Sequence, residues 1–511
     1  MTSATVAFTL NATPVAVEAD GCSLLQALRD QLGVRSPKDG CSPQGQCGCC
    51  TVWVDGQPRV ACVTPVARVA GRSVTTVEGL ADAAQWGERL CAAGGSQCGF
   101  CTPGIVMRLA AVPDAARTEA AVRQSLLAHL CRCTGWNTIV EAACGQFAAG
   151  PRDLAAAAQR AVLEGGAAQT VAPAVALGQG GFAADTAPLD ALVAVRRADG
   201  EWVVGESMQA ALRTAGKVQG RRTTEPLRWP IELPTGDFVR TLQTTWVEPA
   251  YLEPDAAWCR PGGDAVGPLT NGGAFGGKST TPSPVAVAAR TLADAHGRTV
   301  LAVYSREDVV RLGPKRPPVA MGLRADGSGV VRVARTPGVA AAIAGYAPSL
   351  VVEEVDVSGP PTSAQVRAAG WAEAAVLLAG VLLAGDDGRV TAPNGACAHA
   401  VVRDDGSIAV EVECGDPLDE AVLRSYCIGA AHMALGWVRH EGISVSADGE
   451  PLDLTIRSFG VVRAVDTPAI EVSVLGGDGP PINGSDAVFA AVAAAVWRHD
   501  GFLPRWPTMR A

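Results

Sequence analysis

The sequence contains two groups of cysteines whose spacing suits metal binding through sulfur. The first group follows the pattern C-x5-C-x2-C-x11-C; its members are Cys41, Cys47, Cys50 and Cys62. Four thiolates suit an iron–sulfur cluster or a zinc ion, because both metals accept soft sulfur ligands. A plant-type ferredoxin cluster uses this layout with one residue fewer in the first gap. The spacing therefore predicts a [2Fe–2S] cluster, with a structural zinc site as the alternative, and we interpret Cys49 in the same loop as a non-ligand.

The second group follows the pattern C-x2-C-x29-C-x-C; its members are Cys98, Cys101, Cys131 and Cys133. A single residue separates the last two cysteines, whereas paired zinc ligands are usually about two to four positions apart. Thr102 and Pro103 predict a helix start directly after Cys101. The dipole at a helix N-terminus favours an anionic cluster. The sequence therefore predicts a second [2Fe–2S] cluster.

The elements that would position the first group are short strands and one helix. Two alternating segments separated by Asn11 and Ala12 predict a β-hairpin. A helical segment, the cysteine loop and a second hairpin around Asp55 and Gly56 follow. This order is typical of a ferredoxin-like β-grasp fold. The segments are 4–10, 13–18, 24–32, 51–54 and 59–63.

The second group lies among segments whose apolar residues recur at helical spacing, which predicts a compact four-helix bundle. The predicted helices are 81–94, 104–111, 119–130 and 137–147. An Ala- and Gly-rich stretch, 148–190, then predicts a helix followed by a linker. The expected fold class is α+β, with α/β domains after the linker. The expected domains are 1–77 (ferredoxin-like, [2Fe–2S]), 78–150 (helical bundle, [2Fe–2S]), 151–190 (linker), 191–395 and 396–511 (α/β).

The α/β part alternates short apolar strands with longer amphipathic segments. The predicted strands are 299–304, 329–335, 408–414 and 469–475. The predicted helices are 284–296, 371–383, 418–440 and 486–497. Such alternation favours sheets covered by helices.

The composition of the 511-residue chain excludes some classes of partner. Its formal net charge is −9 and it has no block of basic residues. A nucleic-acid partner is therefore not expected, because phosphate binding needs clustered lysines and arginines. No apolar run reaches the roughly 18–20 residues of a membrane span, and residues 1–10 lack the pattern of a signal peptide. We expect a cytoplasmic protein.

Three segments around the cysteines carry a resemblance to a known family. They are GCSPQGQCGCCTV at 40–52, SQCGFCTPG at 96–104 and HLCRCTGW at 129–136. They resemble the small iron–sulfur subunit of the molybdenum hydroxylases, the family of xanthine dehydrogenase, aldehyde oxidoreductase and carbon monoxide dehydrogenase. The resemblance covers about residues 4–150 and implies that the second cluster lies next to a molybdopterin. It also implies that Gln97 and Cys133 contact the pterin.

A glycine-rich loop, NGGAFGGK at 271–278, precedes a predicted helix. Such a loop can cradle phosphate or a pterin with its N–H groups, although a tight turn with Phe275 in the core also explains it. Motifs at 248–254, 303–308, 315–316 and 367–373 are similar, in order, to those of the large molybdenum-binding subunit. The resemblance thus implies that 191–395 and 396–511 are shortened molybdopterin-binding-like domains. The residues that it places near the cofactor are Gly273, Ala274, Phe275, Gly276, Arg367 and Ala368.

The chain departs from the family pattern at the place of the active site. Only about fifteen residues separate Asp255 from Asn271, where the family carries a long segment. At the position of the family's catalytic glutamate the chain has Asp486, whose carboxylate is one methylene closer to the backbone. A displacement of about 1 Å can cost on the order of 100-fold in rate. Capping of the following helix also explains Asp486, so both roles stay open.

The favoured hypothesis is an electron-transfer subunit that passes electrons from a molybdopterin site through two [2Fe–2S] clusters to an external acceptor. Its C-terminal half would act mainly as a scaffold for a full-length molybdenum-binding catalytic partner. The alternative is a complete single-chain molybdenum hydroxylase without a flavin domain, while the ordered motifs disfavour a free carrier fused to an unrelated domain. Molybdopterin cytosine dinucleotide would be bound by this chain or by the partner. The acceptor would be a flavoprotein, a cytochrome or a quinone-linked chain.

Overall fold

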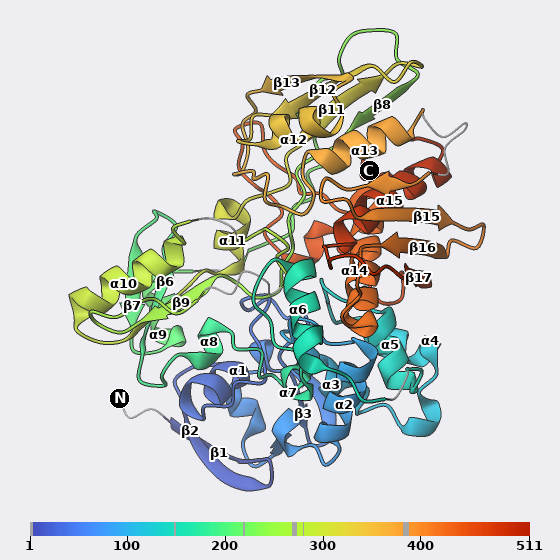
Figure 1. Ribbon diagram of the computed structural model, residues 1–511. Helices are drawn as coiled ribbons and strands as arrows, with labels where there is room; N and C mark the ends of the chain where they lie inside the picture. The colour runs from blue at the N-terminus through green and yellow to red at the C-terminus, as the bar shows by residue number, and fades with distance from the viewer. Residues whose placement is uncertain are drawn as a thin grey trace.

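Four β-sheets organise the residues that the structure describes. The structure is a computed structural model and describes residues 4–147, 150–217, 220–267, 273–278, 281–381 and 388–510. In Figure 1 the N-terminal part, in blue, lies at the bottom, green and yellow-green segments project to the left, and the C-terminal half rises above. Strands and helices are mixed along the whole chain, in agreement with the predicted α+β and α/β pattern.

The first sheet has the strand order β2-β1-β5-β3-β4 and belongs to the cysteine lobe, which we define as residues 4–147. The predicted first hairpin is confirmed: β1 and β2 pair antiparallel, and Asn11 and Ala12 take positive φ angles of 48° and 68°. Two successive positive φ angles suit the twist of a tight hairpin. The strands are β1 (Ala4–Leu10), β2 (Thr13–Ala19), β3 (Thr51–Val54), β4 (Gln57–Val60) and β5 (Ser73–Thr75).

The prediction of a strand over 59–63 is wrong in its second half. Strand β4 ends at Val60, and Cys62 lies in the 3-10 turn η2 (Ala61–Val63). The turn directs the backbone N–H of Cys62 toward the sulfur of Cys50, at 3.4 Å. The helix predicted at 24–32 is present as α1 (Leu24–Gln26) and the π-helical turn η1 (Ala27–Gln31).

The four helices predicted for the second cysteine group are present. Gly94 and Gly145 take positive φ and end the first and last of them, as glycine does at helix C-termini. The third is shorter than predicted, because the chain turns after it so that the N–H of Leu130 reaches the carbonyl of Cys47, at 3.0 Å. The helices are α2 (Ala83–Ala93), α3 (Thr102–Leu109), α4 (Glu119–Ser125) and α5 (Asn137–Cys144).

The segment predicted as a helix followed by a linker contains three helices, of which the first, α6, confirms the predicted helix, and it packs against the rest of the protein. The side chains of Arg160 and Glu164 pair at 3.0 Å, and neither is exposed. Arg160 also donates hydrogen bonds to the carbonyls of Pro417 and Ile482 in the C-terminal half. Figure 1 shows the first of these helices, α6, between the cysteine lobe and the C-terminal half. The helices are α6 (Leu154–Gly165), α7 (Pro173–Ala176) and α8 (Ala183–Thr186).

The second and third sheets have the orders β7-β6-β10-β9 and β13-β12-β11-β8. The predicted strands at 299–304 and 329–335 and the predicted helix at 284–296 are confirmed as β10, β12 and α10. The strands are β6 (Leu192–Arg196), β7 (Trp202–Gly205), β8 (Arg240–Gln243), β9 (Ala256–Cys259), β10 (Val300–Val303), β11 (Val319–Leu323), β12 (Gly329–Ala334) and β13 (Leu350–Val355). The helices are α9 (Met208–Ala215), α10 (Pro284–His296), α11 (Arg306–Leu312), α12 (Val339–Tyr346) and α13 (Trp371–Ala379).

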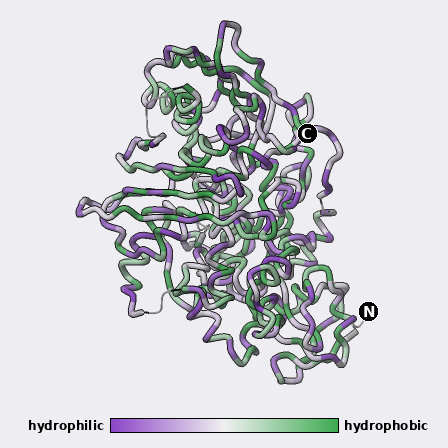
Figure 2. The backbone as a smooth tube through the Cα atoms, turned by 90° about the vertical axis from the view of Figure 1, so that its right-hand side faces the viewer, coloured by the Kyte–Doolittle hydropathy of each residue, from purple (hydrophilic) through white to green (hydrophobic). Residues whose placement is uncertain are grey.

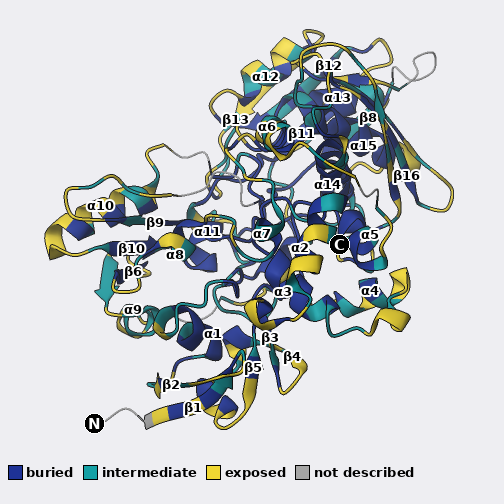
Figure 3. Cartoon of the chain, turned by 60° about the horizontal axis from the view of Figure 1, so that its bottom comes forward, coloured by how far each residue is buried: buried dark blue, intermediate teal, exposed yellow. Residues whose placement is uncertain are grey.

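The fourth sheet, β14-β15-β16-β17, is covered by the two longest helices that the structure describes. Helix α14 is buried from Val422 to Val438 with few exceptions, and Figure 3 shows it mostly in the colours of buried and intermediate residues. A helix that is apolar on every side must lie inside the protein. The elements are β14 (Val390–Thr391), β15 (Cys397–Val402), β16 (Ile408–Glu413), β17 (Ile470–Leu475), α14 (Glu420–Arg439) and α15 (Ser485–His499).

Hydrophobic segments occur throughout the protein, and Figure 2 shows them interleaved with hydrophilic ones. Within the described ranges, none of the helices combines the length and the apolar character that crossing a membrane requires.

Candidate metal centres

The structure brings the four cysteines of the first group together. The side chain of Cys41 contacts those of Cys47 and Cys62, and the side chain of Cys62 contacts that of Cys50. All four are buried, and all sixteen cysteines of the chain are free thiols. The N–H of Gln44 points at the sulfur of Cys41, at 3.1 Å. The loop therefore supplies both sulfur atoms and N–H groups directed at them.

The second group forms two pairs of thiols. The sulfur atoms of Cys98 and Cys133 lie 3.6 Å apart, and the side chain of Cys101 contacts that of Cys131. All four are buried. Helix α3 begins at Thr102, directly after Cys101, so its N-terminal dipole lies beside the group, as the sequence predicted.

This pairing fits a [2Fe–2S] cluster better than zinc. A [2Fe–2S] cluster distributes its four thiolates over two irons, whereas a structural zinc ion gathers four ligands around one centre. Cys49 directs its sulfur to the carbonyl of Cys47, at 3.8 Å, which is compatible with its interpretation as a non-ligand.

The two groups lie on loops that touch each other. The hydrogen bond from the N–H of Leu130 to the carbonyl of Cys47 joins them. A Cβ atom at Gly104, on α3, would lie 2.4 Å from the carbonyl of Gly48, so only glycine permits this contact. Between them the ring of His129 lies 3.2 Å from the hydroxyl of Thr51, and burial lowers the pKa of His129 to about 3. The neutral side chain of His129 therefore lies between the two cysteine loops.

Gln97, predicted to contact a pterin, is directed at α14. Its amide nitrogen donates to the carbonyl of Cys133, at 3.1 Å, and to the hydroxyl of Ser425, at 2.9 Å. Its amide oxygen has no hydrogen-bond partner among the described residues. A Cβ atom at Gly429 would lie 1.8 Å from the carbonyl of Cys133. Helix α14 therefore packs directly against the second cysteine group.

The described part of the glycine-rich loop, 273–278, lies beside the same group; Asn271 and Gly272 lie outside the described residues. A Cβ atom at Gly273 would lie 3.1 Å from the sulfur of Cys133. The next glycine, Gly276, takes a φ of +88° and lies against the carbonyl of Gln365. The structure thus brings together loop and cysteine residues that are far apart in the sequence.

Arg367 connects the loop to Asp486. Its N–H donates to the carbonyl of Phe275, at 2.9 Å, and its guanidinium lies 4.1 Å from the centre of the Phe275 ring. The guanidinium forms an ion pair with Asp486, at 3.0 Å, and donates to the hydroxyl of Ser485, at 2.9 Å. Burial raises the pKa of Asp486, and the positive charge of Arg367 opposes this rise. Asp486 is therefore held by an ion pair.

The prediction that Asp486 is an N-cap is wrong. The N-cap residue of α15 is Gly484, and Asp486 lies in the first turn of the helix. The side chain of Asn483 accepts the hydrogen bond from the N–H of Asp486, at 3.0 Å. Asp486 is therefore free to turn its carboxylate toward Arg367.

The space beside Phe275 is filled by protein side chains, and we call this region the Phe275 interior; it contains Arg132, Phe275, Arg316, Arg367, Trp437 and Glu441. Arg132 forms a two-pronged ion pair with Glu441, at 2.5 and 2.8 Å, and also donates to the carbonyl of Pro249. The cavity left there is about 20 Å³, which holds about one water molecule.

A larger cavity of about 280 Å³ lies on the other side of Phe275; its lining includes Gly276, Arg367, Ala368 and Asp486. Pockets for small organic ligands measure roughly 300–1,000 Å³. The residues that line this cavity do not include Gln97 or Cys133. This cavity therefore does not join Gln97 and Cys133 to the described part of the glycine-rich loop.

Three further buried ion pairs join residues between positions 248 and 373, and local sequence patterns did not reveal them. They are Lys278–Glu253 at 2.5 Å, Lys315–Glu248 at 2.8 Å and Arg316–Glu373 at 2.7 Å. Burial raises the pKa of Glu253 to about 7 against the opposing charge of Lys278, and burial lowers the pKa of Lys315. These pairs lock the strands and loops of the C-terminal half to one another.

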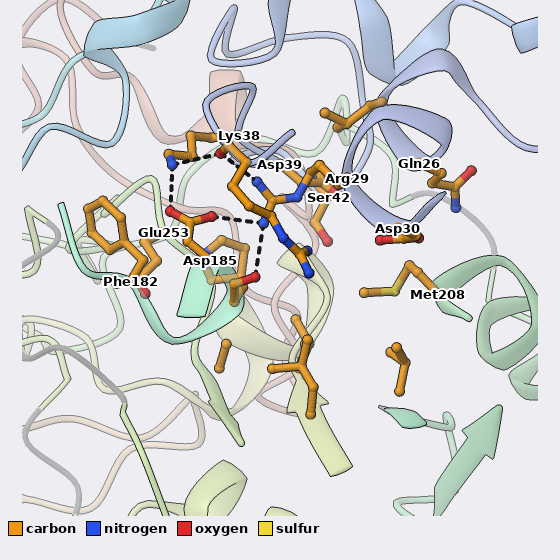
Figure 4. A pocket seen from close by; sticks show the side chains of 18 of the residues that line it. Gln26, Arg29, Asp30, Lys38, Asp39, Ser42, Phe182, Asp185, Met208 and Glu253 are labelled. Atoms are coloured by element: carbon orange, nitrogen blue, oxygen red, sulfur yellow. Dashed lines mark hydrogen bonds and ion pairs between the residues drawn. The ribbon is translucent and has the colours of Figure 1, made fainter. Parts of the chain in front are cut away.

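Another charged cluster attaches the cysteine lobe to α8, which packs against β9 of the second sheet. A cavity of about 80 Å³ lies there, and Figure 4 shows Arg29 and Lys38 converging on Asp185. The distances to its carboxylate oxygens are 2.9 and 2.5 Å. Burial raises the pKa of the neighbouring Asp39 to about 7. The cluster ties the segment of α8 to the loop that carries the first cysteine group.

Comparisons with known proteins agree with this arrangement. Residues 76–144 match the family described as the [2Fe-2S] binding domain. The chain is 38% identical over 144 residues to the xanthine dehydrogenase iron-sulfur-binding subunit of Escherichia coli O157:H7, covering 27% of this chain and 89% of that subunit. It is 42% identical over 136 residues to the xanthine dehydrogenase of Drosophila pseudoobscura pseudoobscura, covering 24% of this chain but only 10% of that protein.

The fold is similar over almost the whole chain to the aldehyde oxidoreductase of Desulfovibrio gigas, with a TM-score of 0.71, 14% sequence identity and 99% of both chains covered. The cysteine groups and the matched domain define an iron–sulfur oxidoreductase. The chain belongs to the molybdenum hydroxylase family.

Proposed function

We propose that the chain is the electron-transfer component of a molybdenum hydroxylase-type oxidoreductase. It passes electrons through two [2Fe–2S] clusters, one in a ferredoxin-like β-grasp domain (1–77) and one in a four-helix bundle (78–150), to an external acceptor. The segment 151–190 joins them to two scaffold domains, 191–395 and 396–511. The cluster ligands are Cys41, Cys47, Cys50 and Cys62, and Cys98, Cys101, Cys131 and Cys133.

The observation that carries this proposal is the filled Phe275 interior next to intact cysteine groups. The thiols are buried and paired, as cluster ligands must be. The neighbouring region, where the family resemblance implies a cofactor, holds the Arg132–Glu441 ion pair and a cavity of about 20 Å³. A region closed in this way favours a scaffold role.

When bound, the clusters supply reversible electron transfer. The chain's own residues hold them and exclude water. Buried thiols, N–H groups aimed at sulfur and the N-terminus of α3 stabilise the negative charge of a reduced cluster. The hydrogen bond from the N–H of Leu130 to the carbonyl of Cys47 joins the two loops, which supports electron transfer from one cluster to the other.

The proposed partner is a molybdenum-binding catalytic subunit, and the acceptor is a flavoprotein, a cytochrome or a quinone-linked chain. The name of the Escherichia coli relative, an iron-sulfur-binding subunit, supports a multi-chain assembly. The substrate would be bound by the partner.

Iron and molybdenum analysis of the purified full chain tests the proposal. We expect about four irons per chain, two for each [2Fe–2S] cluster, together with two paramagnetic signals on reduction, and no molybdenum. Molybdenum near one per chain, with cytosine released from a dinucleotide on hydrolysis, would overturn the scaffold role. Fewer than about three irons per chain would overturn the two-cluster assignment.

A second candidate function is a complete single-chain hydroxylase, and the cavity of about 280 Å³ beside Asp486 and Arg367 favours it. In that case Asp486 would be the general base, and Gly276 and Ala368 would border the cofactor. The same metal analysis decides between the candidates, because only this one requires molybdenum in the isolated chain. Turnover that is lost in Asp486→Asn at unchanged molybdenum content would establish it.

A further inference from the structure

A groove of about 410 Å³ lies outside the regions described so far, and its walls carry four arginines. They come from distant parts of the chain; they are Arg222, Arg457, Arg463 and Arg510. The carboxylate among the residues that line the groove is that of Asp466. The sequence shows no basic block, and the formal net charge is −9. The fold therefore creates a local positive site on an acidic protein.

Two of these arginines have ion-pair partners. Arg463 pairs with Asp466, at 2.6 Å, and both side chains are close to half exposed. Arg510 reaches the buried Asp453, at 3.2 Å, and donates to the carbonyl of Gly442, at 2.6 Å. These two guanidinium groups are therefore partly neutralised, and their positions are fixed.

The other two arginines form no ion pair within the part of the chain that the structure describes. Arg457 donates to the carbonyls of Gln46 and Leu127, at 2.8 and 3.1 Å, and these acceptors are uncharged. Arg222 is exposed and has no hydrogen-bond or ion-pair partner within the part of the chain that the structure describes. Burial lowers the pKa of Arg510, and the like charge of Arg222 lowers it further. Like charges held together without a counter-charge favour the binding of an anion.

The groove also offers an apolar wall. Leu130, Val461 and Val462 line it together with Met509, whose side chain is 60% exposed. Its volume lies within the range of pockets for small organic ligands. A ligand that combines charged groups with an apolar body would use both kinds of surface.

The groove borders both cysteine loops. Leu130 precedes Cys131 in the sequence and donates its N–H to the carbonyl of Cys47. Arg457 donates to the carbonyl of Gln46, the residue before Cys47. A ligand in the groove would therefore lie next to the loops that hold both groups of thiols.

We propose that this groove binds an organic diphosphate, with Arg222 and Arg457 contacting the phosphates and the apolar wall contacting the body of the molecule. The guanidinium fork matches the geometry of phosphate oxygens. Two guanidinium groups without an ion-pair partner among the described residues suit a diphosphate group better than a single carboxylate. The proposal concerns residues outside the cysteine groups and is independent of the proposed function.

Titration calorimetry on the full chain tests the proposal, with ADP as the organic diphosphate and pyrophosphate as the free one. We expect ADP to bind more tightly than pyrophosphate at one site, and both affinities to fall as salt is raised, because the contacts are ionic. Equal affinity for ADP and pyrophosphate would overturn the role of the apolar wall. Absence of binding of either at millimolar concentration would overturn the site.

Arg222→Ala is the decisive variant, because Arg222 is exposed and makes no structural contact that the structure describes. We expect ADP affinity to fall about tenfold or more, the usual consequence of losing a hydrogen bond to a charged group, with unchanged thermal unfolding. Arg311→Ala is the matched control, since Arg311 is also an exposed arginine but does not line the groove. Unchanged affinity in Arg222→Ala, or an equal loss in Arg311→Ala, would refute the assignment.

Discussion

The cysteine lobe and the Phe275 interior carry the residues that the family resemblance marks as functional, but they differ in what those residues contact. In the cysteine lobe, thiols face thiols across short distances, as in the pair Cys98–Cys133 at 3.6 Å. In the Phe275 interior, charged groups face one another, as in the pair Arg132–Glu441 at 2.5 Å, although a guanidinium nitrogen of Arg316 and the indole nitrogen of Trp437 have no hydrogen-bond partner among the described residues.

Two glycines of α14 contribute to this difference between the cysteine lobe and the Phe275 interior. Gly436 allows Glu441 to fold back against α14, because a Cβ atom there would lie 2.2 Å from a carboxylate oxygen of Glu441. Gly429 in turn allows α14 to approach the carbonyl of Cys133. Two glycines in the same buried helix thus hold the Phe275 interior closed and place it directly against the second cysteine group.

The largest expected effect is the loss of one cluster. Cys98→Ser removes half of one thiol pair, so the second cluster should be lost while the first stays. We expect iron to fall from about four to about two per chain and electron paramagnetic resonance to show one [2Fe–2S] signal where the unaltered protein shows two. Cys144→Ser is the control, because that cysteine is half-buried and lies outside both groups. Two unchanged signals in Cys98→Ser would disprove the ligand assignment.

The cysteine groups could be predicted because their ligands are close together in the sequence or repeat a known spacing. The hairpin at Asn11 and the helix over 284–296 are local in the same way, and both are present. The Arg132–Glu441 pair could not be predicted, since 309 positions separate the two residues. The prediction for the cap of α15 was wrong for a local reason. Asn483 lies one residue before the N-cap position, and its side chain accepts a hydrogen bond from the first turn of the helix, the role that was expected of Asp486.

The second expected effect concerns the stability of the Phe275 interior. Glu441→Gln leaves the charge of Arg132 buried without its partner, which typically costs about 3–5 kcal/mol. We expect the free energy of unfolding in urea, followed by tryptophan fluorescence, to fall by that order. The matched control is Asp466→Asn, which breaks an exposed pair with Arg463 and should cost about 0–1 kcal/mol. Equal losses in both variants would mean that the interior is open to water.

The third expected effect is a pH dependence of stability. Burial raises the pKa of Glu253 from its ordinary 4.5 to about 7, so between these values the folded protein holds a proton that the unfolded chain releases. Stability should therefore fall as pH rises through this window, by up to about 3 kcal/mol. In Glu253→Gln this part of the dependence should disappear. Unfolding in urea at pH 5, 6 and 7 measures it, and parallel curves for the two proteins would contradict the assignment.

The smallest expected effect tests the junction between the two regions. Gln97 donates to Ser425 on α14, at 2.9 Å, and both side chains are buried. If this bond joins the cysteine lobe to the scaffold, Gln97→Ala and Ser425→Ala should be coupled by about 1 kcal/mol in a double-mutant cycle of unfolding free energies.

Ser458 provides the control for this cycle, because its hydroxyl donates to the carbonyl of Thr455 within one turn. Gln97→Ala and Ser458→Ala should therefore add without coupling. A coupling below about 0.3 kcal/mol between Gln97 and Ser425 would mean that the amide is not engaged by the scaffold in solution. Gln97 would then be available to a pterin, which would favour the second candidate function, a complete single-chain hydroxylase.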